Sequence, residues 1–383
     1  MGSENSGTSA RLTLCLIADD EVIDRFPAAI RYLQIGLLDE SVDAILVLPD
    51  CSRAESLVAG PSAAVTYCRR RWPLDRFTSP RVTREIREHL AAKGSAAGSA
   101  IVVHSLSITA APLAQDIASG LGSEFVSNVA SSAFRHQPRI IQSLDRASAL
   151  VVPAAGLRDV IQLTPLVSKR VELIRPSVAI DPAIAAFQTA DHVPSIVFAG
   201  ALTLDCGADV LIRAAARVIQ EGDRVLVIIS GKGPAELALR HLVISLKMVE
   251  HVTFTGRLDH LHAALDAADI FCVPRAIGTF REEPIHAMAA GLAIIAAQGV
   301  YCDGLVHQEN AILIPNADET ELAAAIRRLC HRRDEARRLA ANAREAAARL
   351  YSVSRMVSEF VRLYRQLTVR HQTIQIGASP SSH

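Results

Sequence analysis

The sequence lacks several features that would assign it to a common class of protein. It carries no excess of either charge, because 40 Lys and Arg balance 40 Asp and Glu. No field of one sign therefore draws nucleic acid or an anionic membrane to the whole surface. Its longest apolar runs, at 149–157 and 291–297, fall well short of the roughly 20 residues that cross a bilayer. We expect no transmembrane segment and no nucleic-acid partner, and weak peripheral contact with a membrane stays open.

Paired cysteines and the commonest catalytic motifs are also missing. The seven cysteines are odd in number, widely spaced and without a Cys-x-x-Cys pair, which is typical of free thiols in a reducing cytoplasm. No His-Glu-x-x-His, Gly-x-Ser-x-Gly or complete phosphate-loop motif occurs, which removes the commonest metalloprotease, hydrolase and NTPase functions. Residues 1–10 lack the basic and apolar regions of a signal peptide. We expect a cytoplasmic protein that needs no metal and no cofactor.

The sequence does contain enough apolar residues for a large core and a regular alternation of elements. Half of its 383 residues are hydrophobic, and this length is typical of two domains. Short apolar runs alternate with segments of helical period, which predicts an α/β fold class with about six parallel strands in each half. We therefore predict two doubly wound, Rossmann-like domains that face one another across a cleft. Such sheets bind ligands outside the carboxyl ends of their strands.

The domain boundaries follow from changes in composition along the chain. Three prolines and no clean period mark an irregular segment at 176–194, in which we place the linker. A run of mixed charges at 319–349 predicts two solvated helices with a break near 331–333. The predicted organisation is a disordered tail at 1–10, an N-terminal domain at 11–176, a linker at 177–194, a C-terminal domain at 195–350, a helix at 351–367 that packs back on the N-terminal domain, and a disordered tail at 368–383.

An ordered series of motifs in the second half resembles the donor-binding half of the GT-B glycosyltransferases, and in particular glycosyltransferase family four. The motifs are Ile196-Val-Phe-Ala-Gly200, Cys206-Gly-Ala-Asp-Val-Leu-Ile-Arg-Ala214, Val227-Ile-Ile-Ser-Gly-Lys-Gly-Pro234, Val252-Thr-Phe-Thr-Gly-Arg257, Ala267-Ala-Asp-Ile-Phe-Cys-Val-Pro274 and His286-Ala-Met-Ala-Ala-Gly291. The resemblance extends over about 11–367 and is looser in the first half. It implies a GT-B fold and a metal-independent transferase that moves a sugar from a nucleotide sugar to a glycan or small-molecule acceptor with retention.

The resemblance also implies where the substrates bind. The first domain would present the acceptor, with His104 beside the transferred sugar. His104 and Glu283 are candidate catalytic residues, and neither role is assigned. The second domain would hold the donor through glycine turns and the loop before His286, so the candidate donor-binding residues are Gly200, Gly231, Lys232, Gly233, Arg275, Gly278, Thr279, Phe280, Arg281 and His286.

The sequence departs from the family at four positions that carry its donor chemistry. Where the family has an Arg and a Lys, this chain has Ala201 and Cys206, and where it has two Glu residues eight apart, this chain has Gly278 and His286. Losing one electrostatic contact typically costs about 100- to 1,000-fold in rate. Neighbouring residues offer substitutes, which are the cations Lys232, Arg275 and Arg281, the acids Glu282 and Glu283, and His286 as a partner for a ribose hydroxyl.

Several of these residues have simpler structural explanations. The glycines at 231 and 233 also suit a tight strand–helix turn, and Lys232 also suits an exposed turn. Glu283 precedes Pro284 and fits a helix start better than catalysis. The acids at 19–21 either contact sugar hydroxyls or cap the next helix at Asp24, and we favour capping.

Two other functions stay open beside the transferase. One is a catalytically impaired GT-B relative that binds a glycan, a nucleotide or a partner subunit, which the four departures favour. The other is a different two-domain nucleotide-sugar enzyme, such as an epimerase. A test of nucleotide sugars for binding and hydrolysis separates them.

Overall fold

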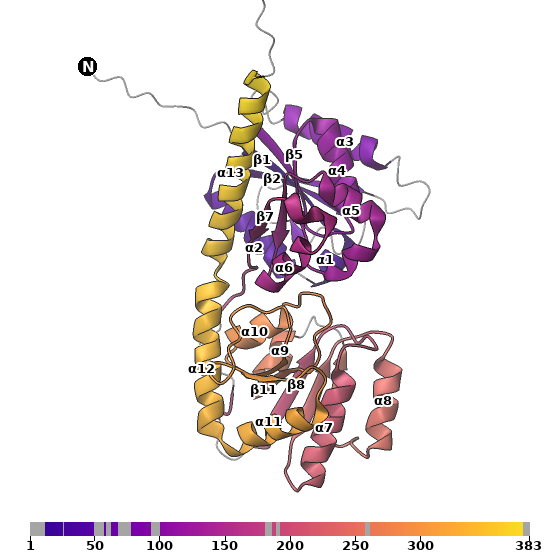
Figure 1. Ribbon diagram of the computed structural model, residues 1–383, viewed down its shortest axis with the longest axis vertical. Helices are drawn as coiled ribbons and strands as arrows, with labels where there is room; N and C mark the ends of the chain where they lie inside the picture. Colours follow the sequence, from indigo (N-terminus) through magenta and orange to yellow (C-terminus); the bar gives the residue numbers. More distant parts are fainter. Residues whose placement is uncertain are drawn as a thin grey trace, which may run out of the picture. The chain divides into compact units, whose positions relative to one another are not determined.

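The chain forms two compact units (Figure 1). This computed structural model describes residues 12–25, 27–49, 57–58, 63–67, 78–92, 100–180, 186–188, 192–256 and 261–377. Unit 1 combines Met1–Ser177 with Val353–His383, and unit 2 is Val178–Ser352. The chain therefore leaves unit 1 once and returns to it. The predicted tail at 1–10 lies outside the described residues.

Unit 1 is built on a seven-stranded parallel sheet, as far as the described residues show, in the order β3-β2-β1-β4-β5-β6-β7. The order changes direction between β1 and β4, which makes the sheet doubly wound. One strand that the sequence did not predict is β3, at the sheet edge, with the sequence Ala-Ala-Val-Thr-Tyr. The strands are β1 Leu12–Ile17, β2 Asp43–Pro49, β3 Ala63–Tyr67, β4 Ala100–Ser105, β5 Glu124–Asn128, β6 Ala149–Val152 and β7 Val171–Leu173.

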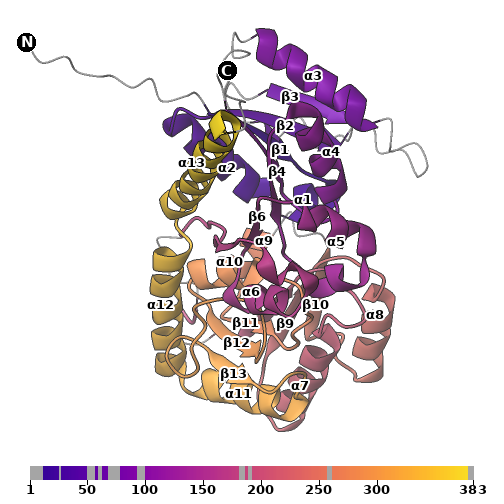
Figure 2. The same ribbon diagram turned by 45° about the horizontal axis from the view of Figure 1, so that its top comes forward.

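The last helix of the chain belongs to the core of unit 1. It lies beside α2 in both views (Figures 1 and 2), and a Cβ on Gly36 of α2 would lie 2.3 Å from a methyl carbon of Val357. Its apolar side, including Phe360 and Tyr364, is buried in the unit 1 core. This helix continues to Gly377, so the disordered tail predicted from Thr368 is wrong as far as that residue. Its apolar face continues to Leu367.

The other helices of unit 1 connect successive strands. Its helices are α1 Asp20–Arg25, α2 Pro27–Asp39, α3 Thr78–Ala92, α4 Ala111–Leu121, α5 Pro138–Asp145, α6 Ala155–Gln162 and α13 Val353–Gly377, with 3-10 turns η3 Ser132–His136 and η4 Pro165–Ser168. No helix within the described ranges combines the length and the apolarity that crossing a bilayer requires.

Unit 2 has a six-stranded parallel sheet in its described part, in the order β10-β9-β8-β11-β12-β13. The six apolar runs expected in this half all form strands. Here the order changes direction between β8 and β11. The strands are β8 Ser195–Ala199, β9 Leu226–Ser230, β10 Val252–Gly256, β11 Ile270–Val273, β12 Ala293–Ala297 and β13 Ile312–Ile314.

The helices of unit 2 pack on this sheet, and several share one apolar cluster with it. The helices are α7 Ala208–Gln220, α8 Glu236–Ser245, α9 Leu261–Asp266, α10 Glu283–Ala289, α11 Glu319–His331 and α12 Arg333–Leu350. The predicted break between the last two falls at Arg332. These two helices are not solvated on all sides, since α12 buries a stripe of alanines that includes Ala336, Ala340 and Ala343.

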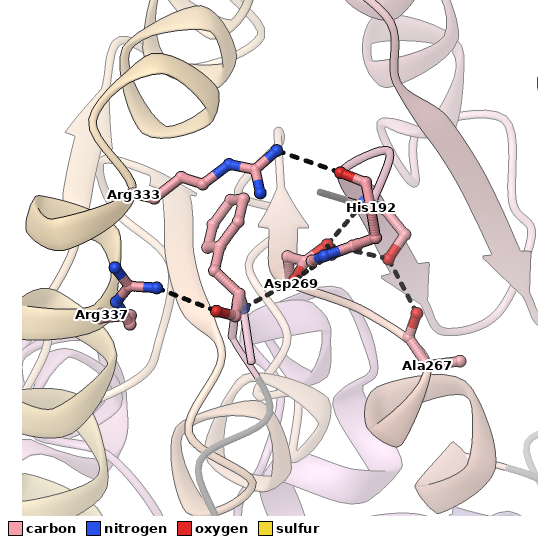
Figure 3. Close-up of polar contacts among 7 residues, drawn as sticks. His192, Ala267, Asp269, Arg333 and Arg337 are labelled. Atoms are coloured by element: carbon pink, nitrogen blue, oxygen red, sulfur yellow. Dashed lines mark hydrogen bonds and ion pairs between the residues drawn. The ribbon is translucent and has the colours of Figure 1, made fainter. Parts of the chain in front are cut away.

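The segment expected as a linker at 177–194 is partly built into unit 2. Phe187 is fully buried in the unit 2 core. The buried carboxylate of Asp269 accepts hydrogen bonds from the backbone N–H groups of Phe187, at 2.7 Å, and Ser195, at 2.8 Å (Figure 3). This attachment could not be predicted from the sequence, because an irregular segment with prolines at 182 and 194 gives no sign that Phe187 between them is buried.

Two arginines of α12 complete this attachment. Arg333 donates to the carbonyl of His192 at 3.0 Å, and Arg337 donates to the carbonyl of Phe187 at 3.1 Å (Figure 3). The Nε2 atom of His192 lies 2.7 Å from a carboxylate oxygen of Asp269. The peptide that enters unit 2 is thus held by side chains of that unit.

Candidate functional site

The loops that follow three adjacent strands of unit 2 lie at one edge of its sheet. Because the strands are parallel, the segments after β9, β8 and β11 all leave from the carboxyl edge. The chain order reverses between β8 and β11, and open α/β sheets bind ligands at such a reversal. All ten candidate donor-binding residues lie in or directly after these loops. We call this region the carboxyl edge of unit 2.

Two glycines allow the loops after β8 and β9 to touch. A Cβ on Gly231, whose φ is +153°, would lie 1.9 Å from the carbonyl oxygen of Gly200. A Cβ on Gly233 would lie 2.3 Å from the carbonyl oxygen of Leu202. The backbone N–H of Leu202 donates to the carbonyl of Lys232 at 3.0 Å. Close backbone approach therefore requires both glycines, whatever the turn binds.

Lys232 lies between these glycines and is exposed. Its Cε atom is 3.6 Å from the position that a Cβ on Gly256 would take, so the side chain extends over the end of β10. Within the described part of the chain it has no ion-pair partner. The turn therefore presents one unneutralised positive charge at the carboxyl edge.

Arg281, one of the candidate donor-binding residues, is buried. Its side chain is 5% exposed, and Nη2 donates to the carbonyl of Ala199. Its guanidinium lies over the ring of Phe198, 5.1 Å from the centroid. The carboxylate of Glu283, also buried, is 3.7 Å from Nε. Glu283 opens α10 as expected, but its side chain faces Arg281.

Arg275 occupies a more open position on the same loop. Its side chain is 31% exposed, and Nη2 lies 3.8 Å from Oδ2 of Asp209 in the first turn of α7. Gly207, at φ +90°, lets α7 begin against this loop, because a Cβ there would lie 2.9 Å from Cβ of Arg275. Asp209 was not among the predicted site residues, although an acid two residues after a glycine at a helix start is a usable signal.

The end of the loop carries His286 and the residues around Gly278. His286 lies on α10, with Nε2 3.8 Å from Oε2 of Glu282. Gly278 has a positive φ of 70°, and Phe280 is buried. Thr279, between them, is half-buried. The residues of this loop therefore lie close together, but not all of their side chains reach the surface.

The two positions that lack the family's cations lie on the β8 loop. Ala201 is exposed and Cys206 is buried. Burial raises the pKa of the Cys206 thiol, and the nearby charge of Arg281 opposes that shift. A neutral thiol therefore lies where the family resemblance led us to expect a positive charge.

His104, the candidate that was expected beside the sugar, is enclosed in unit 1. It lies on β4 with no exposed surface. Its Nε2 donates to Oδ1 of Asn128 at 2.9 Å, so Nδ1 accepts from the hydroxyl of Tyr364 at 2.7 Å. Burial lowers the pKa of His104 to about 4. Both ring nitrogens are used within unit 1, so the expectation that His104 faces a sugar is wrong.

The acidic run after β1 is a helix cap, as favoured from the sequence. Oδ1 of Asp19 accepts from the backbone N–H of Val22 at 3.0 Å, and Oδ2 accepts from the hydroxyls of Ser107, at 2.7 Å, and Thr109. The capped helix begins at Asp20 rather than near Asp24. Asp19 therefore joins the loops after β1 and β4 at the carboxyl edge of unit 1.

Comparison with known proteins shows which family the sequence of unit 2 resembles. Residues 193–332 match the family model described as glycosyl transferases group 1. An MMP alpha-(1->4)-mannosyltransferase from Mycolicibacterium hassiacum is 29% identical over 169 residues, which is 43% of this chain and 41% of that protein. The match thus spans less than half the length of this curated relative.

Solved structures resemble the chain over nearly its whole length. A glycosyltransferase from Rickettsia africae has a TM-score of 0.75 at 12% identity, covering 93% of this chain and 98% of that one. The Anabaena protein HepE, solved in complex with UDP-glucose, has a TM-score of 0.75 at 14% identity, covering 93% and 100%. The chain has the GT-B fold. Unit 2 of this GT-B chain resembles the family-four glycosyltransferases, as the sequence motifs indicated.

A metal centre finds no support in the described ranges of this GT-B chain. No group of three or more His, Cys, Asp or Glu side chains is placed there to hold a metal ion. The described chemistry of the carboxyl edge therefore consists of backbone turns, cations and carboxylates.

Proposed function

We propose that this GT-B chain is a glycosyltransferase that takes a sugar from a nucleotide-sugar donor and passes it to a glycan or small-molecule acceptor with retention. One observation carries the proposal. The family match at 193–332 spans the loops after β8, β9 and β11 that form the carboxyl edge of unit 2. The resemblance of unit 2 to family four supports the retaining outcome of this proposal.

The physical requirement of this reaction is stabilisation of a departing diphosphate. Negative charge develops on the phosphate as the glycosidic bond breaks, and fixed cations stabilise it best where water is excluded. At the carboxyl edge, the described cations are Lys232, Arg275 and Arg281. Arg275 lies 3.8 Å from the carboxylate of Asp209, and Arg281 lies 3.7 Å from that of Glu283. Among the described cations at this edge, Lys232 is therefore the one whose charge no nearby carboxylate balances. We expect Lys232 to contact the diphosphate.

The test is a binding and transfer assay with a panel of nucleotide sugars. Purified protein is titrated with UDP-glucose and GDP-mannose, and each is then assayed for hydrolysis or transfer. Saturable binding that is weakened about tenfold in Lys232→Ala, but not in Lys247→Ala, supports the proposal. The second variant removes an exposed lysine elsewhere in unit 2. Absence of binding by every nucleotide sugar contradicts it.

A second function, a GT-B protein that binds a nucleotide or glycan without transferring sugar, is favoured by a specific observation. The four positions where the family keeps its charged groups carry Ala201, Cys206, Gly278 and His286. Saturable nucleotide-sugar binding with no transfer to any acceptor and no hydrolysis would favour this function over catalysis.

A further inference from the structure

Buried polar atoms without hydrogen-bond partners gather at the carboxyl edge of unit 2. Nearly all buried polar atoms in folded proteins are hydrogen-bonded, so each exception calls for an explanation, such as a bound ligand. The five that lie at this edge, as far as the described chain shows, are Oγ of Ser230, Nε of Arg275, Nη1 of Arg281, Oε2 of Glu283 and Nδ1 of His286. They lie at the end of β9, in the loop after β11 and in the first part of α10, which points to a common ligand.

Arg281 and Glu283 show the mismatch most clearly. The distance of 3.7 Å between Nε and Oε2 is within range of charge attraction but too long for a hydrogen bond. The pair is only 5% and 10% exposed, where an unmade hydrogen bond to a charged group is costly. Nη1 therefore keeps an unused donor, and Oε2 keeps an unused acceptor.

Arg281 and Glu283 lie next to the loop that follows β8. A Cβ on Gly200 would lie 2.2 Å from Nη2 of Arg281 and 3.4 Å from Oε1 of Glu283. The pair thus lies against the β8 loop, where Ala201 follows Gly200 directly. Arg281, in the loop after β11, and Glu283, at the start of α10, therefore place a positive and a negative group beside position 201, where a cation was expected.

We propose that Arg281 and Glu283 act together as the donor-recognition pair of this GT-B chain: Nη1 of Arg281 donates to a phosphate oxygen, and Oε2 of Glu283 accepts from a hydroxyl of the transferred sugar. This inference rests on the proposed function, because a nucleotide sugar contains both complementary groups. An ionised phosphate oxygen only accepts hydrogen bonds, while a sugar hydroxyl donates one.

A consequence of this arrangement is that the loop before the pair moves when the donor binds. Both unpartnered atoms are buried, so a ligand reaches them only if residues around the pair shift, and we expect this shift in the preceding loop, residues 274–280. Gly278, at φ +70°, lies in the middle of that segment. We expect amide hydrogen exchange in 274–282 to change on addition of UDP-glucose or GDP-mannose.

The experiment compares nucleoside monophosphates, nucleoside diphosphates and nucleotide sugars on matched variants. UMP, UDP and UDP-glucose, and the guanosine series with GDP-mannose, are titrated into wild type, Arg281→Met and Glu283→Met. Arg217→Met is the control, since it removes an exposed, ion-paired arginine from α7 of the same unit. Melting temperatures are measured for every variant.

The two single variants have different expected signatures. Arg281→Met weakens diphosphate binding about tenfold or more and monophosphate binding much less, because a charge-assisted bond to phosphate is lost. Glu283→Met weakens nucleotide-sugar binding by a similar factor, but leaves diphosphate affinity unchanged or higher. Arg217→Met binds like wild type. Single variants that bind all three ligands as wild type does would overturn the inference.

A double variant keeps the test valid if a single variant does not fold. Replacing both members of a buried ion pair by apolar side chains is often neutral for stability, so Arg281→Met with Glu283→Met should fold. We expect it to lose the preference for diphosphate and for the sugar. Undiminished preference in the double variant overturns the inference while leaving the proposed function standing. Failure of wild type to bind any nucleotide overturns the proposed function itself.

Discussion

The carboxyl edges of the two sheets differ in how completely their polar groups are satisfied. In unit 1, Asp19 accepts three hydrogen bonds and both nitrogens of His104 are bonded. In unit 2, Arg281 and Glu283 are equally buried but keep unpartnered atoms. A satisfied network stabilises the fold and needs no ligand, whereas an unsatisfied one leaves free energy to be gained on binding. We therefore expect the ligand to bind at the carboxyl edge of unit 2.

The largest expected effect concerns the backbone contact that shapes the edge of unit 2. Gly231→Ala places a Cβ 1.9 Å from a backbone oxygen at positive φ, which neither loop can relieve cheaply. We expect it to lower the free energy of unfolding by more than about 4 kcal/mol. Gly222→Ala is the control, since its φ is +98° and its Cβ would meet nothing within 4 Å. It should cost only about 1 kcal/mol. Equal losses in denaturant unfolding would contradict this account.

The next effect tests the enclosed histidine of unit 1. Burial lowers the pKa of His104 from 6.5 to about 4, so the unfolded chain binds a proton there that the folded chain does not. Stability is therefore complete above pH 6.5 and falls as the pH drops toward 4, by about 3 kcal/mol in total. In His104→Gln this part of the pH dependence should vanish. A variant with the same loss between pH 7 and pH 4.5 would show that another group is responsible.

A smaller effect is expected from the satisfied network of unit 1. Asp19→Ala removes a helix cap and leaves two hydroxyls without their acceptor, which should cost about 2 kcal/mol of stability. Nucleotide affinity should not change. Asp318→Ala is the matched control, because it removes a simpler cap at α11 and should cost about 1 kcal/mol. A change in nucleotide affinity in Asp19→Ala would show that the carboxyl edge of unit 1 also takes part in binding, which contradicts this account.

The smallest stability effect is expected at Lys232. The side chain is exposed, so Lys232→Ala should change the free energy of unfolding by less than about 0.5 kcal/mol. Chemical denaturation measures this. A large loss would show that the lysine holds the turn together, and its effect on diphosphate binding would then be indirect.

The strands and the glycine turns could be predicted from the sequence because their causes are local. Runs such as 195–199 and 270–273 are apolar, short and bounded by turn residues, and all form buried strands. Strand β3 escaped because it lies at an edge and contains two alanines. The glycines at 231 and 233 predicted a tight strand–helix turn, and a Cβ at either position would meet the backbone of the loop after β8.

Side-chain direction at the candidate site could not be predicted, because it depends on residues distant in sequence. His104 is enclosed by Tyr364, 260 residues away, and Arg281 is drawn under Gly200, 81 residues earlier, by a carbonyl and an aromatic ring. Asp269 likewise anchors Phe187 across 82 residues. A single sequence shows which charged residues the chain contains. It does not show which of them come into contact in the buried parts of the fold.

The most direct test of the central claim maps a bound nucleotide sugar onto the chain. Backbone amide shifts are recorded on isotope-labelled protein during titration with UDP-glucose or GDP-mannose. The account predicts saturable changes in residues 200–207, 231–235 and 274–286, with little change around Asp19 and His104. Changes confined to unit 1, or none in unit 2 at saturating ligand, would contradict it.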